Sequence, residues 1–193
     1  MPDPTDAAPG PAQPVPQAPE QVSELPVCPS STRLLQAKDL QACLALDGAA
    51  LGGFWSEGQW LTELEGAGRL CLGIDGPHRP HPETPGHLMA VACGWLVVDE
   101  LHITVLAVHP SRRRRGLGRQ LLEALLAGAQ ARGARHATLE VASGNQAALA
   151  LYGACQFQTA GTRRGYYRNG QDALIQWKRI QADAPSPLES GAR

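Results

Sequence analysis

The hydrophobic pattern changes its period near the middle of the chain. Val105–Val108 form an apolar run without polar interruption, which predicts a buried strand. Pro110 limits this strand, because proline has no backbone N–H to donate to a sheet. Beyond it the apolar residues recur every four positions, which predicts an amphipathic helix with the buried positions Leu117, Leu121 and Leu125. A strand, a basic turn with two glycines and a helix therefore follow one another.

The rest of the pattern predicts alternating strands and helices. Ser56 resembles a helix cap, and Asn169-Gly170 indicates a turn between the last two strands. The strand–helix–strand unit in the middle implies one parallel pair, so the sheet is expected to be mixed. The expected helices are 39–50, 57–65, 117–132 and 143–155, and the expected strands are 69–74, 88–98, 101–108, 136–141, 157–160 and 172–178.

Composition separates one folded domain from two tails. Residues 1–30 hold nine prolines and no aromatic residue, so they cannot bury enough apolar area to offset their chain entropy. Four acids and no basic residue also make them unlike a signal or transit peptide. We therefore expect a disordered N-terminal tail over 1–30, one domain over 31–181 and a flexible C-terminal tail over 182–193.

Charge and cysteine usage exclude several classes. The net charge of −1 argues against a dedicated nucleic-acid binder, and no apolar stretch approaches the length of a membrane helix. The five cysteines are scattered without a C-x-x-C pair, which favours reduced thiols in a cytoplasmic protein and no metal site. His78 and His81 lie in a proline-rich stretch without neighbouring ligands, and a solvated loop is favoured there.

The glycine turn predicts an anion cradle. Gly116 and Gly118 let a ligand approach the backbone, and the first N–H groups of the helix have no partner within it. The turn lacks the Lys-Ser or Lys-Thr of a nucleotide P-loop, and Leu121 stands where a dinucleotide fingerprint has its third small residue. Arg112–Arg115 oppose the helix dipole unless an anion is bound. A nucleic-acid patch and a plain surface turn are the alternatives.

The spacing Arg113-x-x-Gly116-x-Gly118 resembles the acetyl-coenzyme A signature of the Gcn5-related N-acetyltransferase (GNAT) family. Leu139–Phe157, LEVASGNQAALALYGACQF, is similar to a second family motif. Trp55-Ser56 and the Arg163–Tyr167 segment resemble the bacterial subgroup that acetylates the N-terminal alanine of a ribosomal protein. The resemblance implies a single α/β domain with a mixed, mostly antiparallel twisted sheet of six or seven strands flanked by helices.

The resemblance also implies an acetyl-CoA site and two catalytic groups. Glu140 would be the base that takes the proton of the acceptor amine, and Tyr152 the acid that protonates the leaving thiolate. The implied coenzyme contacts are the backbone of Leu106, Ala107 and Val108, the cradle residues Arg114, Arg115, Gly116, Leu117, Gly118 and Arg119, and the side chain of Asn145.

Each of these assignments has an alternative. Glu140 could be a strand-edge carboxylate paired with an arginine, with Glu100 as the base instead. Tyr152 could be an interfacial aromatic whose hydroxyl binds a carbonyl, and Asn145 could only cap its helix. Gln156 replaces the glycine of the family and would have to adopt a left-handed conformation, at a cost of roughly 1 kcal/mol.

The expected function is acetyl transfer from acetyl-CoA to an N-terminal α-amine, without an acyl-enzyme. The expected partners are acetyl-CoA and the N-terminal segment of a ribosomal protein, with no metal, nucleic acid or membrane. Two alternatives stay open: acetylation of a small-molecule amine or of a protein lysine, and a non-catalytic coenzyme A-binding regulatory module.

Overall fold

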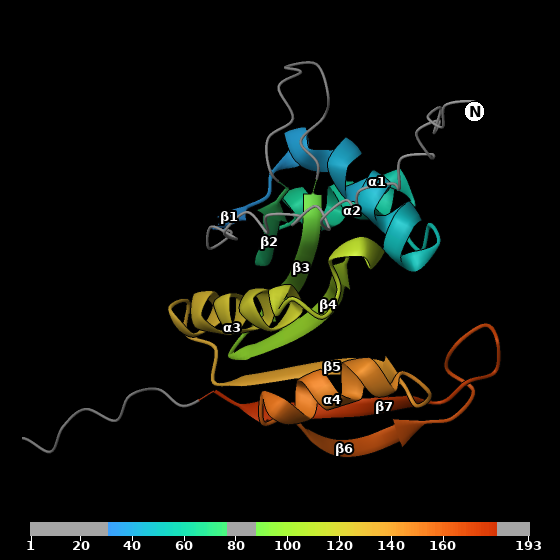
Figure 1. Ribbon diagram of the computed structural model, residues 1–193. Helices are drawn as coiled ribbons and strands as arrows, with labels where there is room; N and C mark the ends of the chain where they lie inside the picture. The colour runs from blue at the N-terminus through green and yellow to red at the C-terminus, as the bar shows by residue number, and fades with distance from the viewer. Residues whose placement is uncertain (1–30, 77–87, 181–193) are drawn as a thin grey trace, which may run out of the picture.

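The fold is that of a computed structural model, which describes residues 31–76 and 88–180. Its centre is a seven-stranded sheet in the order β1-β2-β3-β4-β5-β7-β6, in which β4 and β5 are parallel and the other neighbours antiparallel (Figure 1). The strands are β1 (Thr32–Leu34), β2 (Arg69–Asp75), β3 (Leu88–Val97), β4 (Glu100–Val108), β5 (His136–Ala142), β6 (Gln158–Arg163) and β7 (Ala173–Arg179).

Helices cover both faces of this sheet. The helices α1 and α2 pack on one face of β2, β3 and β4, and α3 packs on the other. The helix α4 belongs to the same buried cluster as α3 and lies over β5 and β7 (Figure 1). Their bounds are α1 (Leu40–Leu51), α2 (Glu57–Glu65), α3 (Leu117–Gln130) and α4 (Gln146–Ala154), with short 3-10 turns η1 (Ala37–Asp39) and η2 (Pro110–Arg112). The expected mixed α/β fold is confirmed.

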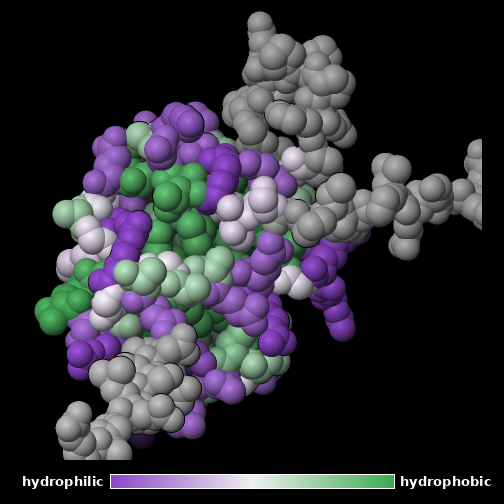
Figure 2. Space-filling model, turned by 90° about the vertical axis from the view of Figure 1, so that its left-hand side faces the viewer, coloured by the Kyte–Doolittle hydropathy of each residue, from purple (hydrophilic) through white to green (hydrophobic). Residues whose placement is uncertain are grey.

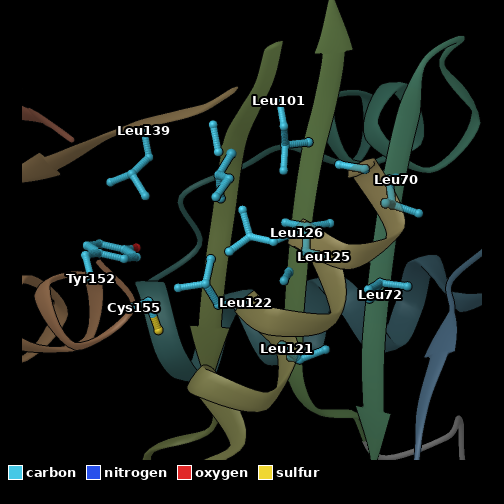
Figure 3. Close-up of a cluster of buried hydrophobic side chains, with 14 of the residues drawn as sticks. Leu70, Leu72, Leu101, Leu121, Leu122, Leu125, Leu126, Leu139, Tyr152 and Cys155 are labelled. Carbon is cyan, nitrogen blue, oxygen red and sulfur yellow. The ribbon is translucent and has the colours of Figure 1, made fainter. Parts of the chain in front are cut away.

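The leucines of α3 pack this helix against the sheet. Leu117, Leu121 and Leu125 are all buried, as their spacing predicts, and Leu122 and Leu126 join them. The four leucines from Leu121 to Leu126 point toward Leu70, Leu72 and Leu101 of the strands, with Tyr152 approaching from α4 (Figure 3). Full burial of one such side chain stabilises a fold by about 1.5–3 kcal/mol. This contact fixes where the glycine turn before α3 lies relative to β4.

The strands β4 and β5 pair over only three positions, from Glu100–His136 to His102–Thr138. Beyond these pairs β4 rises away from β5, so the sheet opens into a fork (Figure 1). We use the word fork for the space between Thr104–Val108 of β4 and Glu140–Ala142 of β5. On the open side of β4, the backbone of Leu106–Val108 has no neighbouring strand in the part of the chain that the structure describes.

A β-bulge lies where the fork begins. Cys93 of β3 pairs with Val105 and Gly94 with Ile103, so Thr104 is the extra residue. The bulge changes the faces of β4: Ile103 joins the cluster under α3, whereas Val105 and Ala107 join the cluster under α1 and α2. Leu106 and Val108 are only half-buried, which corrects the expectation of a continuously buried strand. Both side chains pack against the edge of the cluster under α3.

Other boundaries differ from the expectation at short or capped elements. The strand β1 was not predicted, since three residues are too short to show a period. The helix α4 begins after Asn145 rather than at 143, because the Asn145 side chain caps it. The strand β6 starts at Gln158 and runs to Arg163, longer than the predicted 157–160. The tails 1–30 and 182–193, and both His78 and His81, lie outside the described residues.

Seen from the left-hand side of Figure 1, the surface is mostly hydrophilic, with apolar side chains gathered in patches between charged ones (Figure 2). None of the helices in the described ranges is long and apolar enough to cross a membrane. The four described cysteines are free thiols, each of them buried.

The end of α4 explains how Gln156 is accommodated. Gln156 has φ +66°, its N–H donates to Gly153 O at 2.9 Å, and the Phe157 N–H donates to Tyr152 O at 2.9 Å. These two bonds form a Schellman motif, in which the residue after the cap is left-handed. Gln156 thus adopts the left-handed conformation that the glycine of the family would favour. The same motif packs Phe157 on Tyr152, with ring centroids 5.8 Å apart.

Gln156→Gly is therefore expected to stabilise the protein. Glycine adopts this conformation without the steric cost of a Cβ atom, which is about 1 kcal/mol. The melting temperature should rise by about 2–4 °C, a shift typical of a protein of this size. Differential scanning calorimetry measures it, and Gln156→Ala serves as the control because it loses the amide but keeps Cβ. A lower melting temperature for the glycine variant would contradict this account.

Candidate active site

The glycine turn forms a concave arrangement of backbone amides at the start of α3. Arg114 has φ +61° and Gly116 has φ +80°, so left-handed residues alternate with others along the turn. Such alternation aims successive N–H groups at one point and makes an anion site. The first bond that belongs to α3 runs from Gln120 N to Gly116 O at 3.0 Å. The N–H groups of the first three helical residues precede it and face the turn.

The arginines of the turn divide into two groups. Arg113 is used by the protein itself, since its guanidinium donates to Val108 O at 3.3 Å and to Ala50 O at 3.2 Å. It thereby ties the end of β4 to α1. Arg114 and Arg115 are exposed and make no ion pair with any residue in the described ranges. Their positive charge is available to an anion in the turn.

Gly118 brings the turn against both sides of the fork. A Cβ atom at this position would lie 3.4 Å from Leu151 of α4 and 3.5 Å from Val108 of β4, which is ordinary contact. A Cβ atom at Gly116, by contrast, would meet open space, but the positive φ of this residue would strain any other side chain. Gly116 is therefore required for its backbone conformation, whereas the distances at Gly118 show how near the turn lies to Val108 and Leu151.

Gly116→Val is expected to weaken acetyl-CoA binding at least tenfold. A β-branched residue at φ +80° is strained by about 1–3 kcal/mol, so the turn would rearrange and lose its aimed N–H groups. Titration calorimetry with acetyl-CoA measures the affinity, and circular dichroism checks the fold. Gly170→Val is a matched control, because Gly170 has the same φ of +80° but lies in the β6–β7 connection. Unchanged affinity in a folded Gly116→Val protein would contradict this role of the turn.

The helix α4 carries two of the expected site residues. Asn145 caps it, with Oδ1 accepting a hydrogen bond from Ala148 N at 3.1 Å. The cap uses only the carbonyl oxygen, so the amide NH₂ can still serve a ligand and the two roles do not compete. Tyr152 lies two turns further on and is buried. Burial and the neighbouring Tyr167 raise the pKa of Tyr152 to about 12.

The Tyr152 hydroxyl forms no hydrogen bond with any group in residues 31–76 and 88–180. Its oxygen is not among the fully enclosed unpaired atoms of these residues, so it reaches the protein surface and can meet a ligand. With its pKa raised, this phenol stays protonated over the whole physiological range and presents a proton donor.

Glu140 lies on β5 inside the fork, between Leu139 and Val141, which are buried under α3 and α4. Its own side chain is 11% exposed and has two partners on the opposite face of the sheet. Arg163 Nη2 lies 3.1 Å from Oε1, and His102 Nε2 lies 3.3 Å from Oε2. Pairing with an arginine, the alternative that the sequence left open, is thus present, but it occupies only one carboxylate oxygen.

Tyr167 links the two sides of the fork electrostatically. Burial raises its pKa, and the charges of Tyr166 and Glu140 add to the effect. Tyr167 in turn acts on the pKa of Tyr152. Its side chain is therefore near both Glu140 and Tyr152. The competing base, Glu100, begins β4 at the closed end of the fork, opposite His136.

A second buried carboxylate, Glu63 of α2, lies under the bulge. It pairs with Arg69 Nη1 at 2.6 Å and accepts from Thr104 Oγ1 at 3.1 Å. Burial raises its pKa, opposed mainly by Arg69. Its ligand atoms and those of Cys71 and Cys93 lie within 4.8 Å of one another. The Glu63 carboxylate is already paired with Arg69 and Thr104. Cys71 Sγ donates to the Glu63 carbonyl oxygen at 3.2 Å. We therefore interpret the cluster of Glu63, Cys71 and Cys93 as packing rather than as a metal site.

The structure thus brings together most of the expected residues and adds others. Gly118 of the cradle lies between Val108 of β4 and Leu151 of α4, Glu140 lies on β5 at the fork, and Asn145 and Tyr152 lie on α4. The pattern of the sequence assigned no role to the residues that surround Glu140. Arg163, Tyr167 and Glu63 belonged to resembling motifs without a stated role, and no sequence signal marked Thr104 or His102.

Comparisons with known proteins agree with this geometry. The sequence model of the "Acetyltransferase (GNAT) family" matches residues 53–157. A Salmonella typhimurium protein named [Ribosomal protein bS18]-alanine N-acetyltransferase is 35% identical over 145 residues, 74% of this chain and 92% of that protein.

Two solved structures share the fold. The ribosomal-protein-S18-alanine N-acetyltransferase from Escherichia coli superposes with a TM-score of 0.69 at 32% identity, covering 82% of this chain and 98% of that one. Arabidopsis thaliana NAA60 in complex with acetyl-CoA superposes with a TM-score of 0.67 at 17% identity, covering 78% and 98% of the two chains. At 17% identity, the similarity to NAA60 concerns the fold alone.

Proposed function

Because the chain belongs to the acetyltransferase (GNAT) family, whose members use acetyl-CoA, we propose that it acetylates the N-terminal alanine of ribosomal protein bS18. The observation that carries the proposal is the fork between β4 and β5, with an anion cradle at the start of α3, a carboxylate on β5 and a protonated phenol on the neighbouring helix α4. The acceptor is supported by a relative of that name that matches this chain over 92% of its own length.

Acetyl-CoA would bind along the fork. The cradle formed by Arg114, Arg115, Gly116, Leu117, Gly118 and Arg119 would hold the pyrophosphate through backbone N–H groups and positive charge. The open backbone edge of Leu106, Ala107 and Val108 would pair with the pantetheine amides as an added strand does. The free amide NH₂ of Asn145 would bind the coenzyme arm. No metal takes part in this proposal.

Glu140 and Tyr152 would then divide the proton transfers. An ammonium cannot attack a thioester, so Glu140 accepts a proton from the acceptor nitrogen, directly or through a water. The neutral amine attacks the acetyl carbonyl, and the tetrahedral intermediate expels the coenzyme A thiolate and releases its second nitrogen proton to water, which leaves the neutral amide. Tyr152 donates its hydroxyl proton toward the sulfur as the bond breaks. The four described cysteines are buried, which favours direct attack over an acyl-enzyme.

The reaction fits a cytoplasmic protein, because ribosomal proteins and acetyl-CoA are both found there. We expect neither a membrane nor a nucleic acid to be needed, since the cradle arginines would be occupied by the coenzyme phosphates.

A peptide panel tests the acceptor. We would incubate the purified protein with acetyl-CoA and the N-terminal peptide of bS18 from the same organism, and locate the added acetyl group by mass spectrometry. The proposal expects acetylation of the α-amine, no acetylation of the same peptide with a blocked N-terminus, and no acetylation of its lysines. Modification of lysine alone, or of small amines alone, would overturn the acceptor. Binding of acetyl-CoA without any transfer would favour a regulatory module.

A further inference from the structure

His102 lies at the point where the fork begins. It is the last residue of β4 that pairs with β5, opposite Thr138, and on its other side it pairs with Trp95 of β3. Glu140 follows Thr138 by two positions and lies on the same face of β5, since side chains alternate along a strand. His102 and Glu140 therefore meet at the closed end of the fork, with Nε2 3.3 Å from Oε2.

The two partners of Glu140 differ in what they can do with a proton. Arg163 stays charged and can only donate to the carboxylate. Histidine takes up and releases a proton near neutral pH. The His102 side chain is 37% exposed whereas that of Glu140 is 11% exposed. His102 thus joins a largely buried carboxylate to the solvent.

We propose that His102 is the proton acceptor that restores Glu140 after each transfer, an inference that rests on the proposed role of Glu140 as base. The proton leaves the acceptor nitrogen for a Glu140 oxygen. It then passes to Nε2 of the neutral His102 ring, so that the carboxylate is ionised again. The resulting imidazolium releases one proton to water and is neutral once more.

Several charged groups face this pair from the surrounding elements. Glu63 of α2 interacts electrostatically with His102, and Tyr167 of the β6–β7 connection with Glu140. Arg69 pairs with Glu63, and Arg163 of β6 pairs with Glu140. A proton on the His102 ring would interact with these carboxylates and guanidiniums. The pH dependence of kcat is therefore expected to reflect all of these charged residues together. His102 is nevertheless the member that contacts Glu140 and is open to solvent.

Kinetics with matched variants test the relay. We expect His102→Ala to lower kcat at neutral pH about tenfold or more, as loss of a proton-transfer partner does, and to leave the KM for acetyl-CoA within about twofold. Added imidazole should restore part of this rate, because the relay works from the solvent side, and should not restore Glu140→Gln. His136→Gln is the control, since His136 lies on the same face of β5 but stacks on Trp177.

A measurement without acceptor separates this inference from the proposed function. The NMR resonance of the His102 Nε2 atom is expected to shift in Glu140→Gln, because this nitrogen lies 3.3 Å from Glu140 Oε2. An unmoved resonance would overturn the contact between His102 and Glu140 even if the protein acetylates bS18. A His102→Ala enzyme with the wild-type rate, or with a deficit that imidazole leaves unchanged, would overturn the relay. Failure of the bS18 peptide alone would overturn only the acceptor, and the kinetics would use whichever amine is acetylated.

Discussion

Glu140→Gln is expected to lower kcat for acetyl transfer by about 10²–10⁴-fold at neutral pH, the range for a lost general base. Glutamine keeps the size of the side chain and can still accept a hydrogen bond from Arg163. It cannot take the proton of the acceptor amine. The affinity for acetyl-CoA should stay the same, because Glu140 lies on β5 and the cradle lies at the start of α3.

The pH profile provides the sharper test of the same variant. An α-amine has a pKa of about 7.7–8.0, so most of the acceptor is already neutral above about pH 9. The deficit of Glu140→Gln should therefore shrink as the pH rises. Arg163→Gln is a useful companion, because it removes the other partner of the carboxylate and leaves the base in place. Near-native turnover of Glu140→Gln at neutral pH would rule out this base.

Tyr152→Phe is expected to lower kcat by a similar factor, about 10²–10⁴-fold. The phenyl ring keeps the packing on Phe157, whose centroid lies 5.8 Å away, so the end of α4 should be undisturbed. Only the hydroxyl is lost, and with it the proton donor for the thiolate. The hydroxyl has no partner among the described residues, so its removal should leave the melting temperature nearly unchanged.

The pKa of Tyr152 predicts how this group behaves with pH. Since burial raises it to about 12, the phenol stays protonated, and ionisation of Tyr152 should not limit the rate below about pH 11. The wild-type and Tyr152→Phe profiles of kcat should therefore run parallel across the neutral range. A ratio that changes steeply there, or near-native turnover of the variant, would contradict the assignment.

Much of the fold could be predicted from local patterns in the sequence. The helical period of α3 is clear in the sequence because Leu117, Leu121 and Leu125 all face one core. The turn before α3 is also marked in the sequence, because its two glycines and its arginines stand between a strand pattern and a helical pattern. The bulge at Thr104 has no such mark, since one extra residue in a strand needs no special composition. It could not be foreseen, although it decides which side chains of β4 line the fork.

The environment of Glu140 was beyond sequence reasoning for a different reason. Its partners His102 and Arg163 come from β4 and β6, and only the strand order of the folded sheet brings them near β5. A histidine or an arginine within a strand pattern is ordinary. The Asn145 cap and the left-handed Gln156 were foreseeable because both depend on residues within one or two turns of the same helix.

Only three residue pairs join β4 to β5, and this narrow junction has a thermodynamic consequence. The sheet consists of two halves whose main-chain hydrogen bonds are nearly independent, so local opening between them should need less free energy than global unfolding. A coenzyme that pairs with the edge of Leu106–Val108 would bridge the halves and stabilise them by mass action. Amide exchange along the fork should then slow with rising acetyl-CoA concentration, so that the rigidity of the protein follows the supply of its own acetyl donor.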